Sequence, residues 1–208
     1  KHMAYCATSD ITAYGNFPST TISSDIVVIG SLITRAEAII DQYTGRTFEC
    51  TSAEVSTKYF DIYDVLDDGV TLLFEDDFMG VSTDASAITA GTDAITSTAF
   101  TYLPHNGTPY WGIRLKDNSA STWDDETSDG DWENAIQIKG YWCYSKTAPA
   151  DIQHACIRLV YYLYKQRETN ADLDRPLLTG DGVTIMPTKL PADVTSILNR
   201  YKRVRTYG

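Results

Sequence analysis

Apolar residues recur at spacings of three and four in three stretches of the chain, and each stretch predicts an amphipathic helix. The first helix is expected over residues 24–44, with Gly45 as its left-handed C-cap and Gly30 as a point of close approach to another helix. The second is expected over residues 149–168 and the third from Pro191 onwards, because proline and aspartate suit a first helical turn. The predicted apolar faces consist of Ile26, Ile29, Ile33, Ala36, Ile40 and Tyr43 in the first helix, Ile152, Cys156, Leu159 and Leu163 in the second, and Val194, Ile197, Leu198 and Tyr201 in the third.

Between the first two helices the apolar pattern shortens to alternation, which predicts β-strands. The expected strands are short and are separated by linkers rich in Gly, Ser, Thr, Asp and Asn. They cover residues 58–63, 70–74, 87–89, 99–103, 111–115 and 135–144. Residues 116–132 are polar and acidic and predict a mobile loop, and residues 169–188 predict a second long loop. Residues 10–14 predict a short helix capped by Ser9.

The order of these elements predicts an α+β protein. A small antiparallel helical bundle is expected to carry an inserted β-rich, barrel- or sandwich-like subdomain, because neither long helical stripe can bury its apolar face alone. The helical core is expected to comprise residues 4–50 and 146–208, and the acidic insertion residues 51–145. Residues 1–3 are set aside as a tag remnant. No apolar run approaches the length that spans a bilayer and no signal peptide is recognised, so we expect a soluble protein.

Charge is distributed unevenly along the chain, whose formal net charge is -11. Residues 50–134 contain 17 acidic and three basic residues, whereas the remainder contains 11 acidic and 14 basic residues. Because DNA affinity comes from Lys and Arg side chains that displace counterions, the middle of the chain is not expected to hold nucleic acid tightly. The four cysteines, Cys6, Cys50, Cys143 and Cys156, fit no zinc-binding pattern, and we interpret all four as reduced thiols in a cytosolic setting.

Candidate catalytic and metal-binding residues form no recognisable set. His105 and His154 each lack a second ligand at helical spacing, and no nucleophile elbow, Walker loop or dinucleotide-binding motif occurs. A calcium loop that begins at Asp125 fails, because its sixth position is Gly130 and its twelfth is Gln137. A looser calcium site within residues 116–132 stays open as an alternative. We therefore expect no enzyme, no catalytic residue, no metal and no cofactor.

A glycosidase needs two carboxylates at a fixed separation, and an aromatic platform suits sugar stacking. The residues considered for such a site are Asp61, Asp64, Glu75, Trp111 and Trp123. Nothing in the sequence fixes a pair among the carboxylates, and aromatic residues at alternating strand positions are usually core residues or cross-strand pairs.

Three short phrases occur in a fixed order in the helical parts of the chain. The first reads Ala36-Glu37-Ala38-Ile39-Ile40-Asp41-Gln42-Tyr43-Thr44-Gly45-Arg46-Thr47-Phe48. The second reads Ile136-Gln137-Ile138-Lys139-Gly140-Tyr141-Trp142, followed by Pro149-Ala150-Asp151-Ile152 and Ala155. The third reads Leu190-Pro191-Ala192-Asp193-Val194 with Leu198, Tyr201 and Arg203. Together they resemble the head–tail connector (adaptor, head-completion) proteins of tailed double-stranded DNA bacteriophages, over residues 24–48 and 135–205. The motif residues to which the resemblance assigns a structural role are Asp41, Tyr43, Gly45, Arg46, Phe48, Pro149, Asp151, Pro191 and Asp193.

The resemblance implies a structural virion protein that assembles in the bacterial host cytoplasm and resides at the head–tail junction. It implies a ring of twelve copies under the portal, which extends the DNA channel and joins the head to a tail or stopper. The implied partners are further copies of the chain, the portal protein, a stopper or tail-completion protein, and double-stranded DNA that passes without tight binding; no membrane is implied. The candidate portal contacts are the basic residues Arg200, Lys202, Arg203 and Arg205.

Three further interpretations remain open at the level of sequence. The chain could be a tail-completion or tail-terminator ring protein, although the pair of long helices argues against it. It could also be a carbohydrate- or calcium-binding β module with helical flanks, which a ligand would stabilise against heat. A small hydrolase would need convergent titratable groups in a pocket.

Overall fold

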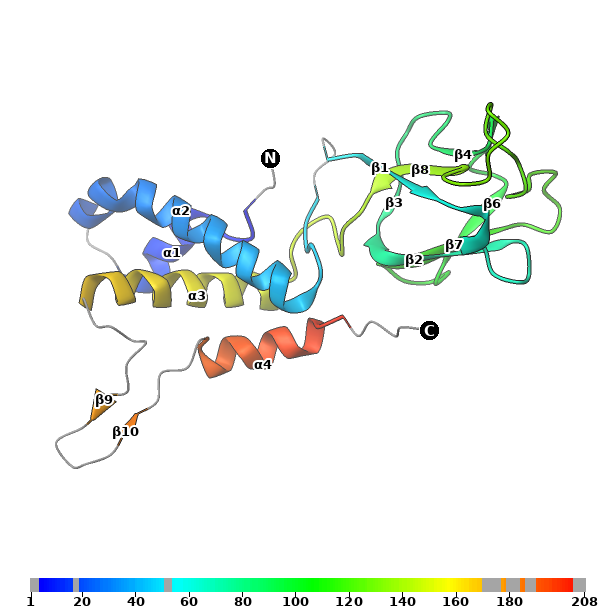
Figure 1. Cartoon of the computed structure of the whole chain (residues 1–208). Coiled ribbons are helices and arrows are strands. Elements are labelled where there is room, and N and C mark those ends of the chain that lie inside the picture. The colour runs from blue at the N-terminus through cyan, green and yellow to red at the C-terminus, as the bar shows by residue number, and fades with distance from the viewer. Residues whose placement is uncertain are drawn as a thin grey trace. The chain divides into compact units, whose positions relative to one another are not determined.

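Figure 1 shows the computed structural model of the chain, which describes residues 4–16, 19–50, 54–169, 177–178, 184–185 and 190–203. The chain forms two compact units. We call Thr47–Thr147 the β unit, and Ala4–Arg46 together with Ala148–Gly208 the helical unit. The β unit is continuous in sequence, whereas the helical unit is built from the two flanking segments.

The helical unit contains four α-helices among the described residues: α1 (Thr8–Gly15), α2 (Ser19–Thr44), α3 (Ala150–Thr169) and α4 (Ala192–Tyr201). Helix α3 packs against the other three, and α2 and α3 run side by side in Figure 1. The three predicted long helices are confirmed, and α2 begins five residues earlier than expected. Their apolar faces bury Ile29, Ile33, Ala36 and Ile40 on α2, Ile152, Ala155, Cys156, Leu159 and Val160 on α3, and Val194 and Leu198 on α4.

Two details of the predicted α2 stripe are wrong. Ile26 was placed on the buried face but is 49% exposed. Gly30 was expected to mark a close helix–helix approach, yet a Cβ built at this position has no heavy atom within 4 Å. Gly45 does cap α2 as predicted, with φ +67° and its N–H donating to Asp41 O at 2.8 Å.

The short predicted helix also exists, but its cap differs from the expected one. Helix α1 begins at Thr8, and Ala7 rather than Ser9 is its N-cap residue. The Asp10 carboxylate accepts the Ala7 N–H at 2.8 Å, so an acidic side chain in the first turn satisfies the N-terminal donor.

The β unit contains two antiparallel sheets. One comprises β1 (Ser56–Phe60), β8 (Ile136–Tyr141), β4 (Ile88–Ala90) and β5 (Asp93–Ala94) in that order, with β3 (Gly80–Val81) also paired to β8. The other has the order β2 (Thr71–Phe78), β7 (Tyr110–Leu115), β6 (Phe100–Leu103). A 3-10 turn, η1 (Ile62–Asp64), follows β1. Strands β3 and β5 were not predicted, because two residues are too few to show alternation.

Both sheets contribute to one apolar core. Buried side chains of β2, β6 and β7 form a single cluster with those of β4 and β8. The acidic loop over residues 116–132 also enters this core, because Trp123 is 1% exposed and its indole N–H donates to Val70 O at 2.9 Å. The loop has no regular secondary structure, as predicted, but its middle is anchored in the core by this side chain.

The predicted architecture, an α+β protein in which a small helical bundle carries an inserted subdomain, is therefore wrong. The described part of the chain is mixed and sheet-rich, with four α-helices and eight strands in two antiparallel sheets of the β unit. The alternating sequence pattern predicted an apolar face for each strand, but it did not predict that the apolar faces of two sheets pack against each other. The β unit therefore has a core of its own, and it is not an outgrowth of the helices.

Most of the predicted loop over residues 169–188 lies outside the described residues. Within it, β9 (Leu177–Leu178) and β10 (Thr184–Ile185) pair as a small antiparallel ladder. Across the described residues, no helix combines the length and apolarity needed to cross a membrane.

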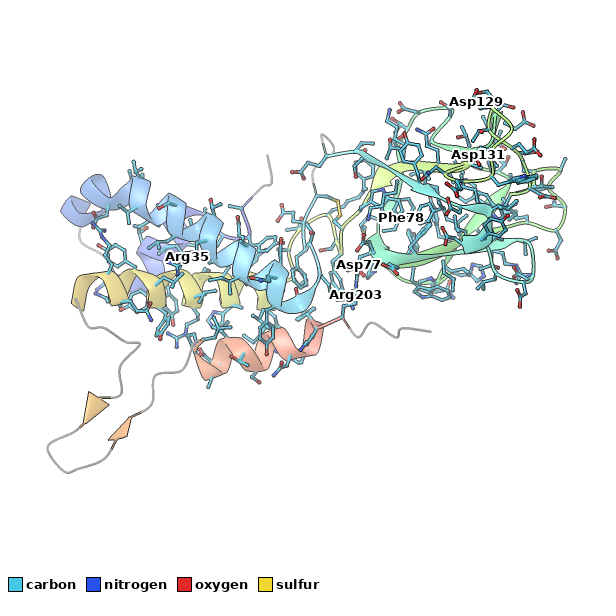
Figure 2. The ribbon with its side chains drawn as sticks, in the orientation of Figure 1. Arg35, Asp77, Phe78, Asp129, Asp131 and Arg203 are labelled. Atoms are coloured by element: carbon cyan, nitrogen blue, oxygen red, sulfur yellow. A yellow bond between two sulfur atoms is a disulfide. The ribbon has the colours of Figure 1, made fainter. Side chains whose placement is uncertain are left out.

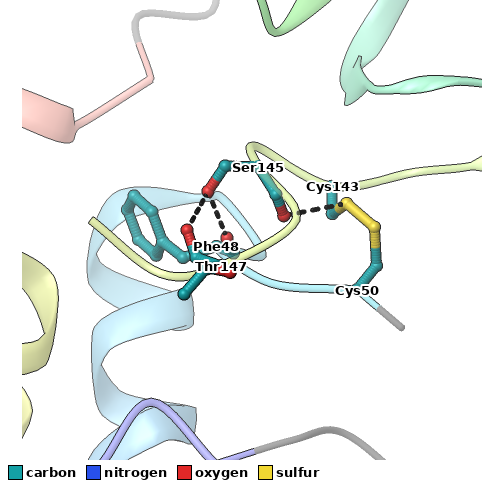
Figure 3. The surroundings of a disulfide bond; sticks show 5 residues. All are labelled: Phe48, Cys50, Cys143, Ser145 and Thr147. Carbon is teal, nitrogen blue, oxygen red and sulfur yellow. Dashed lines mark hydrogen bonds between the residues drawn. A yellow bond between two sulfur atoms is a disulfide. The ribbon is translucent and has the colours of Figure 1, made fainter. Parts of the chain in front are cut away.

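A disulfide joins Cys50 to Cys143 where the chain enters and leaves the β unit (Figure 3). Their Cα atoms are 5.8 Å apart, within the range of protein disulfides. The interpretation of all four cysteines as reduced thiols is wrong for this pair, because 93 residues separate the two and only the fold brings them together. Beside the bond, Ser145 Oγ lies 3.0 Å from Phe48 O and 2.6 Å from Thr147 O, with its hydroxyl as the donor.

Candidate functional site

The C-terminal ends of α2 and α4 are fastened to each other, and we call this contact region the helical junction. Tyr43 Oη donates to Asn199 Oδ1 at 2.7 Å. Arg46 Nε donates to Tyr201 O at 2.7 Å, which places a cation at the C-terminal end of α4, where the helix dipole favours it. Two motif residues of the first phrase therefore contact α4, the helix that follows the third phrase.

The backbone of the helical junction continues this contact beyond both helices. The Arg203 N–H donates to Thr44 O at 2.8 Å, so one of the unpaired carbonyls at the end of α2 gains a partner. Gly45 supplies the left-handed turn that makes this possible, and a Cβ there would lie 3.8 Å from Arg203 Cβ, an ordinary contact distance. The requirement for glycine thus comes from the backbone conformation, not from lack of space.

Asp41, the first motif residue, fastens the N-terminal segment to α2. Tyr5 Oη donates to Asp41 Oδ1 at 2.6 Å, and the Tyr5 N–H donates to Glu37 Oε1 at the same distance. Tyr5 is 4% exposed, so these charge-assisted bonds are partly shielded from water.

Two ion pairs join α3 to α4, and each contains one aspartate of the second or third phrase. Arg158 Nε donates to Asp193 Oδ2 at 2.7 Å, and Arg200 Nη2 lies 3.1 Å from Asp151 Oδ2. The hydrogen bond from Arg158 lowers the pKa of Asp193 below its ordinary value. Both aspartates stand in the first turn of their helices, where the helix dipole also favours a negative charge.

The remaining motif residues have structural positions. Pro149 and Pro191 precede α3 and α4. Pro149 O accepts the N–H groups of Ile152 and Gln153, and Pro191 O accepts that of Thr195. Phe48 is fully buried but belongs to the β unit, where its ring centroid lies 5.5 Å from that of Tyr144. The other motif residues belong to the helical unit.

The candidate portal contacts lie at the end of α4. Arg200 and Lys202 are exposed, and Lys202 Nζ is 5.7 Å from the centroid of the Tyr43 ring. Arg203, labelled in Figure 2 just beyond α4, is only partly exposed. Arg205 lies outside the described residues. Because surface ion pairs contribute little net stability, the pairing of Arg200 with Asp151 leaves its guanidinium accessible to a partner.

The β unit has a feature that the sequence did not indicate, an open groove of about 400 Å³. Lys58 forms an ion pair with Asp76, and its ammonium nitrogen lies 4.5 Å from the centroid of the Trp142 ring. The Trp142 indole N–H donates to Ser56 O at 3.1 Å, and its ring packs against Phe78 at a centroid distance of 4.5 Å. The groove is lined by Lys58, Tyr59, Phe60, Asp64, Leu73, Glu75, Asp76 and Trp142.

The glycosidase residues considered from the sequence are only partly brought together. Asp64 and Glu75 line the groove, but Asp61 Oδ1 accepts the Asn134 N–H at 2.6 Å. Trp123 is in the core, where no ligand reaches it. Lys58 and Trp142 were missed, because 84 positions separate them in the sequence and no local pattern links them.

The acidic loop does not assemble a recognisable cation site. Its tip carries Asp129 and Asp131, which Figure 2 labels, and Thr127 Oγ1 accepts the Asp131 N–H at 3.0 Å. Among the residues with described side chains, no group of three or more His, Cys, Asp or Glu residues could hold a metal ion. The calcium alternative therefore gains no support from the arrangement of these side chains.

Neither histidine stands in a cluster of titratable groups. His105 is exposed in a turn of the β unit. His154 is exposed on α3, with its ring centroid 6.2 Å from that of Tyr14 in an edge-to-face contact.

No protein-family model matches the chain, and no curated protein matches it. The interpretation of the helical junction therefore rests on the three phrases of the chain and on the contacts between them.

Proposed function

We propose that the chain is a structural virion protein, a head–tail connector (adaptor) subunit that forms a ring under the portal and joins the phage head to a tail or stopper. The proposal rests on the contacts that connect the three connector-like phrases to the packed helices of the helical unit. Tyr43 and Arg46 of the first phrase contact α4, and Asp193 of the third phrase pairs with Arg158 on α3. Phrases that are distant in sequence thus form one connected structure, as expected if they specify a common architecture.

The distribution of charge supports a role beside moving DNA. The β unit contains 18 acidic and five basic residues. Phosphates are repelled by such a surface, so a channel lined by it would let duplex DNA pass without tight binding. The helical unit carries one more basic than acidic residue, and it is the part we assign to contacts with the portal.

The buried face of α4 limits which variants can test the proposed portal contact. Removing residues 190–208 would delete α4, whose Val194 and Leu198 are fully buried, and would therefore disturb the whole helical unit. Substitution of the exposed Arg200 and Lys202 keeps Val194 and Leu198, and it removes one surface ion pair, Arg200–Asp151, of a kind that contributes little net stability. The double variant R200E/K202E reverses two charges at the end of α4.

The test is a pull-down of the full chain by the portal protein encoded in the same phage genome. We expect R200E/K202E to lower the affinity roughly tenfold or more, because charges at the edge of an interface steer association. The control R35E/K146E makes the same change in net charge at two exposed positions outside α4. Equal retention of the two variants would refute the assignment of α4, and failure of the unsubstituted chain to bind any portal would count against the connector itself.

The groove of the β unit favours one second candidate, a carbohydrate-binding module. Exposed Tyr59, the Trp142 ring and the carboxylates of Asp64 and Glu75 offer stacking and hydrogen-bonding groups. A ligand at 100 times its dissociation constant stabilises a protein by about 2.7 kcal/mol. A thermal-shift screen with oligosaccharides separates the candidates, since the connector predicts no shift and the module predicts a saturable one.

A further inference from the structure

The two cysteines outside the disulfide lie next to each other in the helical unit. The sulfur atoms of Cys6 and Cys156 are 3.2 Å apart, although 150 positions separate the residues. Cys6 is 4% exposed and Cys156 is fully buried. Cys6 precedes α1, and Cys156 lies on the face of α3 that meets the core. The chain therefore contains two cysteine pairs, of which one is bonded and the other is in contact.

The separation of these sulfur atoms is close to what a covalent bond needs. A disulfide holds its sulfur atoms about 2.05 Å apart, so closure requires roughly 1 Å of movement. Cys6 lies in the irregular segment that precedes α1, where local opening and adjustment cost less free energy than in the centre of a helix. Small changes in the backbone before α1 are thus sufficient to bring the two sulfur atoms together.

We propose that Cys6 and Cys156 form a second, reversible disulfide that joins the N-terminal segment to α3. The bond would enclose the Cys50–Cys143 loop in sequence, so that both crossings of the chain between the units would lie within a covalent ring. The inference does not depend on the connector function, because it concerns only chemistry within the helical unit.

The reaction balances with a small-molecule disulfide as the oxidant. The Cys6 thiolate attacks one sulfur of the oxidant, which forms a mixed disulfide and releases a first thiolate. The Cys156 thiolate then attacks Cys6 Sγ, which forms the protein disulfide and releases a second thiolate. Each protein thiol loses a proton, the protein loses two electrons in total, and the oxidant is reduced to two thiols.

The surroundings of the pair explain why the bond would form slowly and only after local opening. The hydrogen bond with Cys6 and the burial of the thiol raise the pKa of Cys156, and the nearby carboxylates of Glu37 and Asp41 add to the effect. The same two carboxylates hold Tyr5, the neighbour of Cys6, in place. Release of Tyr5 would expose Cys6 to the oxidant.

The experiment uses the full chain incubated with oxidised glutathione. In a parallel sample under native conditions, the rate of maleimide labelling measures how quickly Cys6 becomes accessible. The incubation with oxidised glutathione lasts many times longer than this labelling time. After acid quenching, intact mass and a non-reducing peptide map report the products. We expect both thiols to disappear, with a mass loss of two hydrogen atoms and a cross-linked peptide that contains Cys6 and Cys156.

The functional readout is proteolysis of the N-terminal segment. Oxidation should slow cleavage by thermolysin at Ile11 roughly tenfold or more, because opening of the segment is suppressed, and a reductant should restore the original rate. The variants C6S and C156S should show no protection under the same treatment. Persistence of both thiols, a lasting glutathione adduct, a scrambled pairing with Cys50 or Cys143, or failure of the maleimide to reach either sulfur would each overturn the proposal.

Discussion

Single residues at the end of α2 decide whether the helical junction can form. Gly45 adopts a left-handed conformation, and the turn that it makes brings Thr44 O to the Arg203 N–H. Arg46 then reaches Tyr201 O. A side chain at position 45 has enough space, so the conformational preference of the residue is the quantity that a substitution tests.

The variants G45A and G30A form a matched pair for this purpose. Alanine at position 45 should lower the free energy of unfolding by about 1–2 kcal/mol, since left-handed backbone is disfavoured for residues with a Cβ. Alanine at position 30 should raise it by about 0.5–1 kcal/mol, because Gly30 lies inside α2 with no atom within 4 Å of the new methyl group. Thermal denaturation measures both, and a loss of stability in G30A or none in G45A would contradict this description of α2.

At the scale of elements, two surface ion pairs accompany the apolar packing between α3 and α4. Val194 and Leu198 are buried against α3, and the Arg158–Asp193 and Arg200–Asp151 pairs flank them. The pKa of Asp193 is lowered by the hydrogen bond from Arg158. A carboxylate with a lowered pKa stabilises the folded state above the unfolded pKa, and the contribution is lost as the pH falls through the folded value.

The variant D193N tests this linkage. At pH 6 it should be less thermostable than the unsubstituted chain, because Asp193 is ionised and paired there. The difference between the two melting temperatures should shrink as the pH falls below about 4, the ordinary range of an unfolded aspartate, and it should vanish once Asp193 is protonated in the folded chain. A difference that stays constant from pH 6 to pH 2.5 would show that the ion pair is not its source.

The elements also show which parts of the fold were accessible from the sequence. The stripes of α2, α3 and α4 were predictable, because residues such as Ile33 and Ile40 lie on one face through local geometry alone. Strand pairing was not predictable, since β8 pairs with β1, β3 and β4 from distant parts of the sequence.

The candidate functional residues also include a set that was predictable from the sequence and a set that was not. The motif residues Asp41 to Arg46 were found as a contiguous phrase, whereas the groove that contains Lys58 and Trp142 was not found. Such a groove depends on which strands become neighbours, and the disulfide between Cys50 and Cys143 depends on the same information. The local periodicity of the sequence indicates neither the groove nor the disulfide.

At the scale of the whole molecule, the disulfide closes the β unit where the chain enters and leaves it. In the chain-entropy description, a cross-link that closes a loop of about 100 residues stabilises the folded state by about 4.7 kcal/mol, and measured values are commonly about 2–4 kcal/mol. The bond lies within the β unit, so its loss should act on that unit first.

The double variant C50A/C143A should therefore lower the free energy of unfolding of the β unit by about 2–4 kcal/mol. Trp123 and Trp142 both lie in the β unit, which makes tryptophan fluorescence a suitable probe of its unfolding in urea. The unsubstituted chain treated with a reductant serves as the comparison and should show the same midpoint as the variant. An unchanged midpoint in both samples would contradict the stabilising role of the bond.

Electron microscopy can decide whether copies of this chain form a ring on a portal, as we propose. Purified chain is imaged by negative staining alone and after mixing with the portal protein of the same phage. If the chain is a connector, a ring of additional density should appear at one end of the portal particles. Free rings are compatible with this result but are not required in the sample that lacks portal. Unaltered portal particles together with a strictly monomeric chain would contradict the proposal.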